Sequence, residues 1–240
     1  MKGLHLTAVL CLLGCLLGAQ PLLAQPEPGV YLATEKGEQG SRHYLLLLSE
    51  DYLIHSVYDS GPAHFVSTLG GFYQSDGDSL YIALEFNSAF GETGERQQNL
   101  SYGYTEGNLV LNGHTDRPYK QEPSLSQPLD GQWLFATRGP DTGQERRGNE
   151  SPRKTLKFLK DGYFQWIAYN TETMDFSGTG GGRYAADNGT YTEVILFFSR
   201  DDSRVGAELS FQFERKGNDW HHTGNNSRGE PMYEIWAIRQ

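Results

Sequence analysis

An internal repeat is the feature of this 240-residue chain that most constrains its fold. The segment Leu48–Tyr58 aligns with Leu159–Tyr169, and the same displacement of 111 positions places Gly70–Tyr73 on Gly181–Tyr184 without a gap. Slightly different displacements align further segments in the same order, over roughly 90 residues. A repeat of this length indicates one folding unit present twice, and the alternative is a chance coincidence of turn and strand signals.

Both copies carry patterns that are typical of β-strands. In Leu209–Phe213, apolar and polar residues alternate, which is the period of a strand with one buried face. Asp161–Gly162 and Asn188–Gly189 accept positive φ angles and favour tight hairpin turns. We therefore predict an all-β protein with two tandem small antiparallel β-barrels of about eight strands each, a size that holds either packed side chains or one small ligand.

A polar segment framed by prolines, residues 121–128, is the predicted linker. It separates a first, divergent barrel over residues 28–120 from a second barrel over residues 129–240. Residues 25–128 contain 5 Lys and Arg against 14 Asp and Glu, whereas residues 129–240 contain 14 against 16. The acidic first half disfavours a nucleic-acid or anionic-lipid partner there.

The N-terminus predicts export. A basic start, the apolar segment Leu4–Leu23 and the small residue Ala24 describe a signal peptide over residues 1–24 and a secreted or periplasmic protein. Leu12–Cys15 also looks like a bacterial lipobox, which would make a lipidated Cys15 the membrane attachment. An uncleaved membrane anchor is a further alternative. Because both cysteines lie in this leader, the exported chain has no disulfide and depends on a buried core.

The second half also carries an ordered series of short motifs. They are Gly131-Gln132-Trp133, Asp161-Gly162-Tyr163-Phe164-Gln165-Trp166, Gly180-Gly181-Gly182-Arg183-Tyr184, Tyr191-Thr192-Glu193, Trp220-His221-His222-Thr223-Gly224 and Glu234-Ile235-Trp236. In this order the chain resembles the lipocalin-like, calycin-type domains of secreted Bacteroidetes-type bacterial proteins, which mostly have no assigned function. The resemblance covers residues 129–240 directly and residues 28–120 through the repeat.

The resemblance implies a barrel whose opening tryptophan packs against a basic residue of the closing strand. Carried onto this chain, it predicts a cation–π pair between Trp133 and Arg239. The first copy departs from the pattern, because Tyr31 replaces the tryptophan and Arg117–Lys120 is short and interrupted by proline. We therefore expect the first barrel to be open or completed by its neighbour.

Aromatic residues of the second copy are the predicted ligand contacts, because they combine a large apolar body with a polar tip. Plain core packing is the alternative for these rings. Arg183 is the predicted contact for an acidic group of the ligand, and exposure to solvent is its alternative. The predicted site consists of Tyr163, Trp166, Tyr169, Arg183, Phe197 and Phe211.

No catalytic or metal-binding pattern emerges. The glycines of Gly178–Gly182 have neither the helix start nor the Lys-Ser/Thr pair of a phosphate loop, so they predict a strand bend. His221 and His222 are adjacent on a strand and point to opposite faces, which prevents them from chelating one ion. With no serine elbow and no cysteine after the leader, we predict no catalytic residue, metal or cofactor.

These observations favour an exported, non-enzymatic protein that binds a small apolar or amphipathic ligand, with no nucleic-acid partner and an undetermined oligomeric state. The first alternative is an envelope or extracellular module with solid barrels, which engages a protein or a glycan through its outer faces. Exposure of Tyr52, Tyr58, Tyr102 and Tyr104 would favour that alternative. The second alternative is a hydrolase that uses carboxylates from distant strands.

Overall fold

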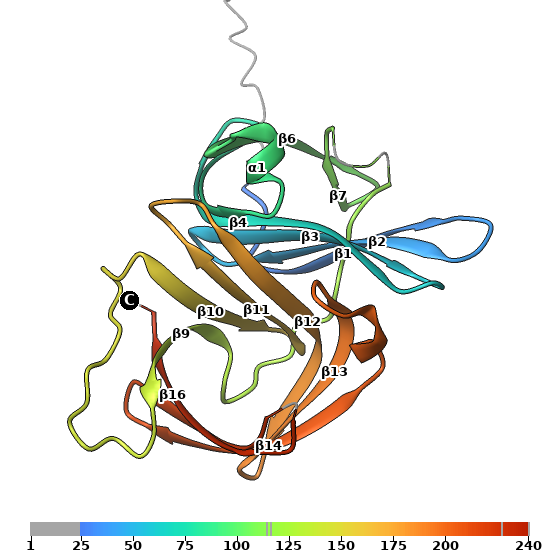
Figure 1. Cartoon of the computed structure of the whole chain (residues 1–240). Helices are drawn as coiled ribbons and strands as arrows, with labels where there is room; N and C mark the ends of the chain where they lie inside the picture. Colours follow the sequence, from blue (N-terminus) through green and yellow to red (C-terminus); the bar gives the residue numbers. More distant parts are fainter. Residues whose placement is uncertain (1–24, 114, 116, 227, 240) are drawn as a thin grey trace, which may run out of the picture.

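The computed structural model describes residues 25–113, 115, 117–226 and 228–239. The chain forms two antiparallel β-barrels in tandem, which lie one above the other in Figure 1. This architecture confirms the predicted fold class. The predicted signal peptide, with Cys15 and Ala24, lies outside the described residues. Within the described part of the chain, no helix is long and apolar enough to span a bilayer.

The first barrel is an eight-stranded sheet in the order β7-β6-β5-β4-β3-β2-β1-β8. Its strands are β1 (Gly29–Lys36), β2 (Ser41–Leu48), β3 (Tyr52–Ser60), β4 (His64–Asp76), β5 (Ser79–Asn87), β6 (Gln97–Thr105), β7 (Asn108–Leu111) and β8 (Lys120–Gln121), with one short helix, α1 (Phe90–Thr93). In the described part of the chain, one bridge between Leu109 and Tyr119 joins the two ends of the sheet, so this barrel is nearly closed. The closing segment is too short to pair along the whole of β7, which is why closure is incomplete. β8 extends the barrel by one residue, Gln121, into the predicted linker.

The second barrel is closed. Its strands are β9 (Gly131–Arg138), β10 (Arg153–Lys160), β11 (Tyr163–Asn170), β12 (Phe176–Asp187), β13 (Thr190–Phe198), β14 (Glu208–Lys216), β15 (Asp219–Asn225) and β16 (Pro231–Ile238), with a short 3-10 helix at Asp202–Arg204. β16 pairs with β9, which completes the hydrogen-bonded ring. Among the described residues, closure leaves no free strand edge in this domain.

The repeat appears in the structure as equivalent strands and an equivalent irregularity. In both barrels the strand register shifts at a glycine pair, between Gly70 and Gly71 in β4 and between Gly181 and Gly182 in β12. A Cβ atom on Gly71 or on Gly182 would lie 1.9 Å from a backbone oxygen of the next strand. The glycines therefore permit a bulge that bends the barrel wall, as the sequence predicts for Gly178–Gly182.

The two barrels share an apolar interface on their outer walls. It is made by residues of both domains: Val30, Leu45, Leu47, Tyr52, Ile54, Tyr58, Phe86, Leu134, Leu156, Phe158, Tyr163, Ile167, Tyr169 and Phe197. Tyr58 stacks on Phe197 with centroids 4.9 Å apart, and Phe86 packs on Tyr169 at 5.1 Å. Tyr58 is the repeat equivalent of Tyr169, and Phe86 is the repeat equivalent of Phe197. The two contacts are therefore related by exchange of the domains, and the interface has approximate two-fold symmetry.

The first barrel has a packed interior. Apolar side chains from all around the sheet fill it, namely Tyr31, Ala33, Tyr44, Leu46, Leu48, Leu53, Val57, Tyr73, Leu80, Ile82, Leu84, Leu100, Tyr102, Leu109, Leu111 and Tyr119. Tyr119 is fully buried and its hydroxyl lies 2.8 Å from Nε2 of His55. The interior of this domain is therefore a core, and a binding cavity is better sought in the second barrel.

Candidate functional site

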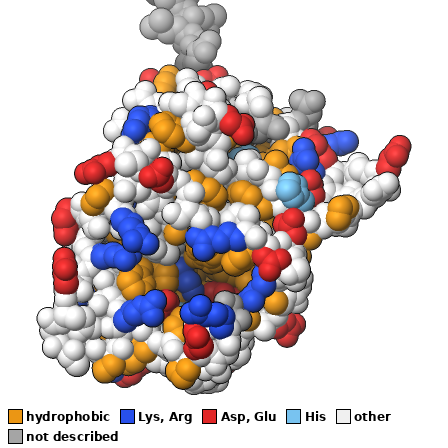
Figure 2. All heavy atoms as spheres, viewed as in Figure 1, with side chains coloured by type: hydrophobic (Ala, Val, Ile, Leu, Met, Phe, Trp, Pro, Cys, Tyr) orange, Lys and Arg blue, Asp and Glu red, His pale blue; other side chains and the backbone are white. Residues whose placement is uncertain are grey.

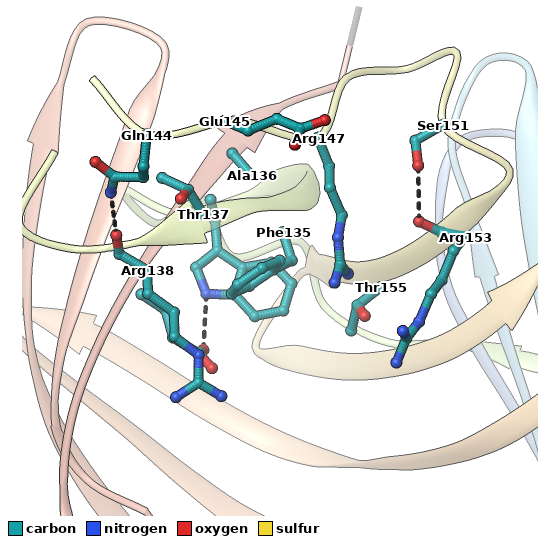
Figure 3. Close-up of a pocket in the computed structure, with 12 residues that line it drawn as sticks. Phe135, Ala136, Thr137, Arg138, Gln144, Glu145, Arg147, Ser151, Arg153 and Thr155 are labelled. Carbon is teal, nitrogen blue, oxygen red and sulfur yellow. Dashed lines mark hydrogen bonds between the residues drawn. The ribbon is translucent and has the colours of Figure 1, made fainter. Parts of the chain in front are cut away.

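A cavity of about 780 Å³ opens at one end of the second barrel. It lies between the second half of β9, the start of β10, the middle of β16 and the segment 139–152 that connects β9 to β10 (Figure 3). This volume is within the range of small-molecule sites. The lining residues are Phe135, Ala136, Thr137, Arg138, Gln144, Glu145, Arg147, Ser151, Arg153, Thr155, Glu234 and Trp236.

Two aromatic rings and one carboxylate form the inner part of the cavity. Phe135 and Trp236 meet edge to face with centroids 5.7 Å apart. The Trp236 indole Nε1 donates to Oε2 of Glu234 at 3.1 Å. Burial raises the pKa of Glu234, but the adjacent His222 and the Lys157 ammonium outweigh it and hold the pKa below its ordinary value. Glu234 is therefore an ionised acceptor at the end of an aromatic wall.

Three arginines stand at the rim. Arg138, Arg147 and Arg153 are exposed, and among the described residues no carboxylate lies within ion-pair distance of them. In Figure 3 their side chains run in the same direction beside Phe135 and Thr155. Figure 2 shows Lys and Arg side chains around a hollow in the second barrel, with hydrophobic side chains inside it. Unpaired guanidinium groups at a cavity mouth favour an anionic ligand group.

The segment that carries Arg147 is fixed to the barrel. The backbone N–H of Arg147 donates to the Ala136 oxygen at 2.8 Å, and the guanidinium of Arg147 lies 5.1 Å from the Phe135 ring centroid. The neighbouring Arg146 is tied to Asp141 at 3.0 Å and to Asp219 at 2.6 Å. The rim is therefore organised before any ligand arrives, which reduces the entropy lost on binding.

Below the cavity the barrel is packed around a buried ion pair. Lys157 Nζ lies 2.9 Å from Glu193 Oε1, and the hydroxyl of Tyr191 donates to the same oxygen at 2.8 Å. The ammonium of Lys157 is 5.0 Å from the Trp220 ring centroid and 5.3 Å from that of Trp236. This cluster fills the barrel interior beyond Trp236, so the cavity is confined to the end of the barrel where Phe135 and the arginines lie.

His222 completes this buried cluster. Its Nδ1 lies 3.8 Å from Glu234 Oε2, a contact longer than a direct hydrogen bond in which the ring N–H still favours the ionised carboxylate. Among the described residues, neither of its ring nitrogens has a hydrogen-bond partner. Burial, followed by the charge of Lys157, lowers the pKa of His222, so the ring is neutral at physiological pH.

Sequence reasoning missed Lys157, Glu193, His222 and Glu234. A signal was present, because the polar residues His222 and Glu234 each stand two positions from a tryptophan and so share its inward face. The arginine rim had no such signal. Arg147 lies in a connecting segment, and its position depends on how that segment folds back over β9.

The predicted ligand contacts divide into two groups. Tyr163, Tyr169 and Phe197 lie on the outer wall, in the interface with the first barrel, so they do not line the barrel interior. Trp166 and Phe211 do face inward, where they pack with the core of the second barrel. Phe211 lies 4.4 Å from the His222 ring, and Trp166 lies 5.6 Å from Phe198. Neither of them is among the residues that line the cavity.

Arg183 is also on the outer surface. Its guanidinium lies 3.7 Å from the Tyr163 ring centroid and 3.1 Å from Glu122 Oε2. The hydroxyl of Tyr163 donates to the same Glu122 oxygen at 2.8 Å. Arg183 therefore takes part in a contact with the segment between the barrels, and it is remote from the cavity wall.

The predicted cation–π pair between Trp133 and Arg239 is wrong. Ile238 is paired with Trp133 and packs in the same interior core, so the next residue, Arg239, points outward. Arg239 lies over the rings of Tyr52 and Phe72, with centroid distances of 4.8 and 4.5 Å. The cation over Trp133 is Arg215, at 5.2 Å.

The tyrosines whose exposure would favour a solid interaction module are mostly buried. Tyr52, Tyr58 and Tyr102 are buried, whereas Tyr104 is 44% exposed. These four positions therefore give that alternative little support.

Among the described residues, no cluster of three His, Cys, Asp or Glu side chains is placed to hold a metal ion.

The fold and the cavity define a double β-barrel protein whose second barrel has an arginine-rimmed, aromatic-walled mouth. The chain matches no protein-family model, and no curated protein shows significant sequence similarity to it.

Proposed function

We propose that this is an exported, non-enzymatic protein with lipocalin-like domains that binds a small anionic amphipathic molecule in the mouth of its second barrel. The observation that carries the proposal is the set of three exposed arginines without carboxylate partners around a cavity walled by Phe135 and Trp236. The apolar body of the ligand would pack on the two rings. Its acidic group would bind the guanidinium groups at the rim.

Glu234 gives the site a second polar contact. Its carboxylate is part of the cavity lining and is ionised, so it accepts a hydrogen bond but repels a second acidic group. The preferred ligand therefore has one acidic end and a hydroxyl or amine at the other. A ligand of roughly 20 heavy atoms at about 0.3 kcal/mol per atom would bind with about 6 kcal/mol, or a Kd on the order of 10 to 100 μM.

Titration with 8-anilinonaphthalene-1-sulfonate, an anionic amphiphile, tests the proposal on residues 25–240. We expect binding that quenches tryptophan fluorescence, because Trp236 is part of the cavity lining. A triple variant, Arg138→Gln, Arg147→Gln and Arg153→Gln, should weaken binding by at least about tenfold. Added salt should weaken the wild type more than this variant.

The matched control changes the same net charge elsewhere. Lys36→Gln, Lys120→Gln and Arg228→Gln remove three exposed cations that are not in the cavity lining. Binding should be unchanged in this control. Equal loss in both triple variants, or equally tight binding of a neutral analogue of the dye, would show that the rim does not select an anion.

Export has its own test. Intact mass measured on protein recovered from the extracytoplasmic fraction of a bacterial host should correspond to a chain that begins at Gln25. A lipid-modified Cys15 would give a heavier, membrane-associated product and would replace the signal-peptidase prediction with the lipoprotein alternative.

A further inference from the structure

The outer wall of the first barrel carries an exposed surface on β4, β5 and β6. In one row across the sheet, Gln74 pairs with Tyr81, which pairs with Asn99. In the next row, Phe72 pairs with Ala83, which pairs with Gln97. Alternate residues of a strand face the same side, so all six side chains share the outer face, and all six are exposed. We call these six residues the β4–β6 platform.

Two aromatic rings are the main features of the β4–β6 platform. Tyr81 is 51% exposed and Phe72 is 40% exposed, and they belong to the few large hydrophobic residues of the described chain that are exposed. Phe72 is held in place by the edge of Tyr52 at 5.0 Å and by the Arg239 guanidinium. A hollow of about 670 Å³ lies over this surface, and its lining includes Ala83, Phe72 and Asp51.

The polar side chains of the β4–β6 platform are free to hydrogen-bond to a partner. Within the described residues, the side-chain amides of Gln74, Gln97 and Asn99 and the hydroxyl of Tyr81 make no hydrogen bond to protein. Each amide can donate and accept at once. The surface thus presents the exposed ring of Tyr81 and the part of Phe72 that Arg239 leaves free, beside uncharged groups that hydrogen-bond in both directions.

This chemistry selects among partners. The platform residues carry no charge, and residues 25–128 contain 5 Lys and Arg against 14 Asp and Glu, so an anionic polymer would be repelled. The core of a protein interface is also rich in aromatic residues, but three of the six platform residues are amides, which suit a partner rich in hydroxyl groups. A sugar ring offers an apolar C–H face to stack on an aromatic ring and hydroxyl groups that match amides. We infer that the β4–β6 platform binds a neutral glycan.

This glycan site is independent of the ligand cavity. The β4–β6 platform belongs to the first barrel, whereas the cavity belongs to the mouth of the second barrel. The two sites share no lining residue. A protein with both sites could hold a glycan on one domain while the other domain binds a small anion. Failure of one proposal would leave the other intact.

Affinity electrophoresis of residues 25–240 tests the inference. Native gels would contain one neutral polysaccharide each: laminarin, mannan, dextran, arabinoxylan or hydroxyethylcellulose. We expect at least one of them to retard the protein. Tyr81→Ala should weaken that retardation by about tenfold, and Gln74→Ala or Asn99→Ala by several-fold. Because these side chains are exposed, the variants should keep wild-type unfolding midpoints.

Tyr104→Ala is the matched control, because Tyr104 is 44% exposed but lies outside the β4–β6 platform. Its retardation should equal that of the wild type, as should that of the triple variant at the arginine rim. Migration unaffected by all five polysaccharides would overturn the inference. So would retardation that Tyr81→Ala leaves unchanged, or retardation by the acidic polysaccharide alginate alone.

Discussion

Two repeat-equivalent tyrosines at the barrel interface allow a sharp test of how the domains are held together. The hydroxyl of Tyr52 donates to Glu85 at 2.9 Å, and Arg239 covers its ring and pairs with the same carboxylate at 2.7 Å. Tyr163 repeats this arrangement with Glu122 and Arg183. The two clusters differ in burial. The side chains of Glu85 and Arg239 are 14% and 8% exposed, whereas those of Glu122 and Arg183 are 23% and 49% exposed.

Glu85→Ala should destabilise the protein far more than Glu122→Ala. Glu85 accepts from Arg239, Tyr52 and Tyr169, so its removal leaves a buried guanidinium without its carboxylate. Removing one partner of a buried ion pair costs about 3 to 5 kcal/mol. Glu122→Ala removes a solvent-screened ion pair and one tyrosine hydrogen bond, which together cost about 1 to 2 kcal/mol.

Urea denaturation of residues 25–240 measures this difference. Far-UV circular dichroism follows both barrels, and tryptophan fluorescence follows the second, because all four tryptophans lie after residue 128. We expect one coincident transition for the wild type, since the barrels share a buried interface. A free energy of unfolding that falls equally in the two variants would refute the reasoning.

The contribution of Glu85 to the free energy of unfolding should also decrease at acidic pH. Burial raises the pKa of Glu85, but the Arg239 hydrogen bond and charge, with the bonds from Tyr169 and Tyr52, outweigh it and hold the pKa below its ordinary value. Its contribution is therefore complete above the unfolded pKa of about 4.3 and is lost as the pH falls through the lower folded value. The difference in stability between wild type and Glu85→Gln should shrink over that acidic range, and a constant difference would contradict the assignment.

Three further predictions concern the bulge, the buried histidine and the interface. Gly182→Ala should destabilise or unfold the protein, because its Cβ would lie 1.9 Å from a backbone oxygen, whereas Gly91→Ala meets open space and should be nearly neutral by thermal denaturation. Burial holds the pKa of His222 below its ordinary value, so stability should fall as the pH drops below about 6.5; His222→Leu should flatten that part of the denaturation profile. A double-mutant cycle on Tyr58 and Phe197 should give a coupling energy of about 0.5 to 1.5 kcal/mol, and strictly additive effects would exclude the stacked contact.

Local signals in the sequence were enough to predict the architecture. Strand alternation, the Asp161–Gly162 and Asn188–Gly189 turns, and the repeated glycine pairs are local signals, and the structure has two eight-stranded sheets with equivalent bulges where they fall. Each signal needs only a few neighbouring residues to act, because φ angles, hydrogen bonding and side-chain alternation are properties of the local backbone. The order of the strands then follows from the hairpin connections.

Which residues form a site depends on how the two barrels pack and how their connecting segments fold. β11 is apolar on both faces, because one face lines the barrel and the other packs on the first domain, so its pattern does not indicate which side is the interior. Tyr163, Tyr169 and Phe197 were therefore expected in the cavity but lie in the interface. The rim depends on a connecting segment folding back over β9, which brings Arg147 onto Phe135. A contact between a loop and a strand leaves no periodic pattern in the sequence. The residues at the cavity mouth therefore could not be predicted without the three-dimensional structure.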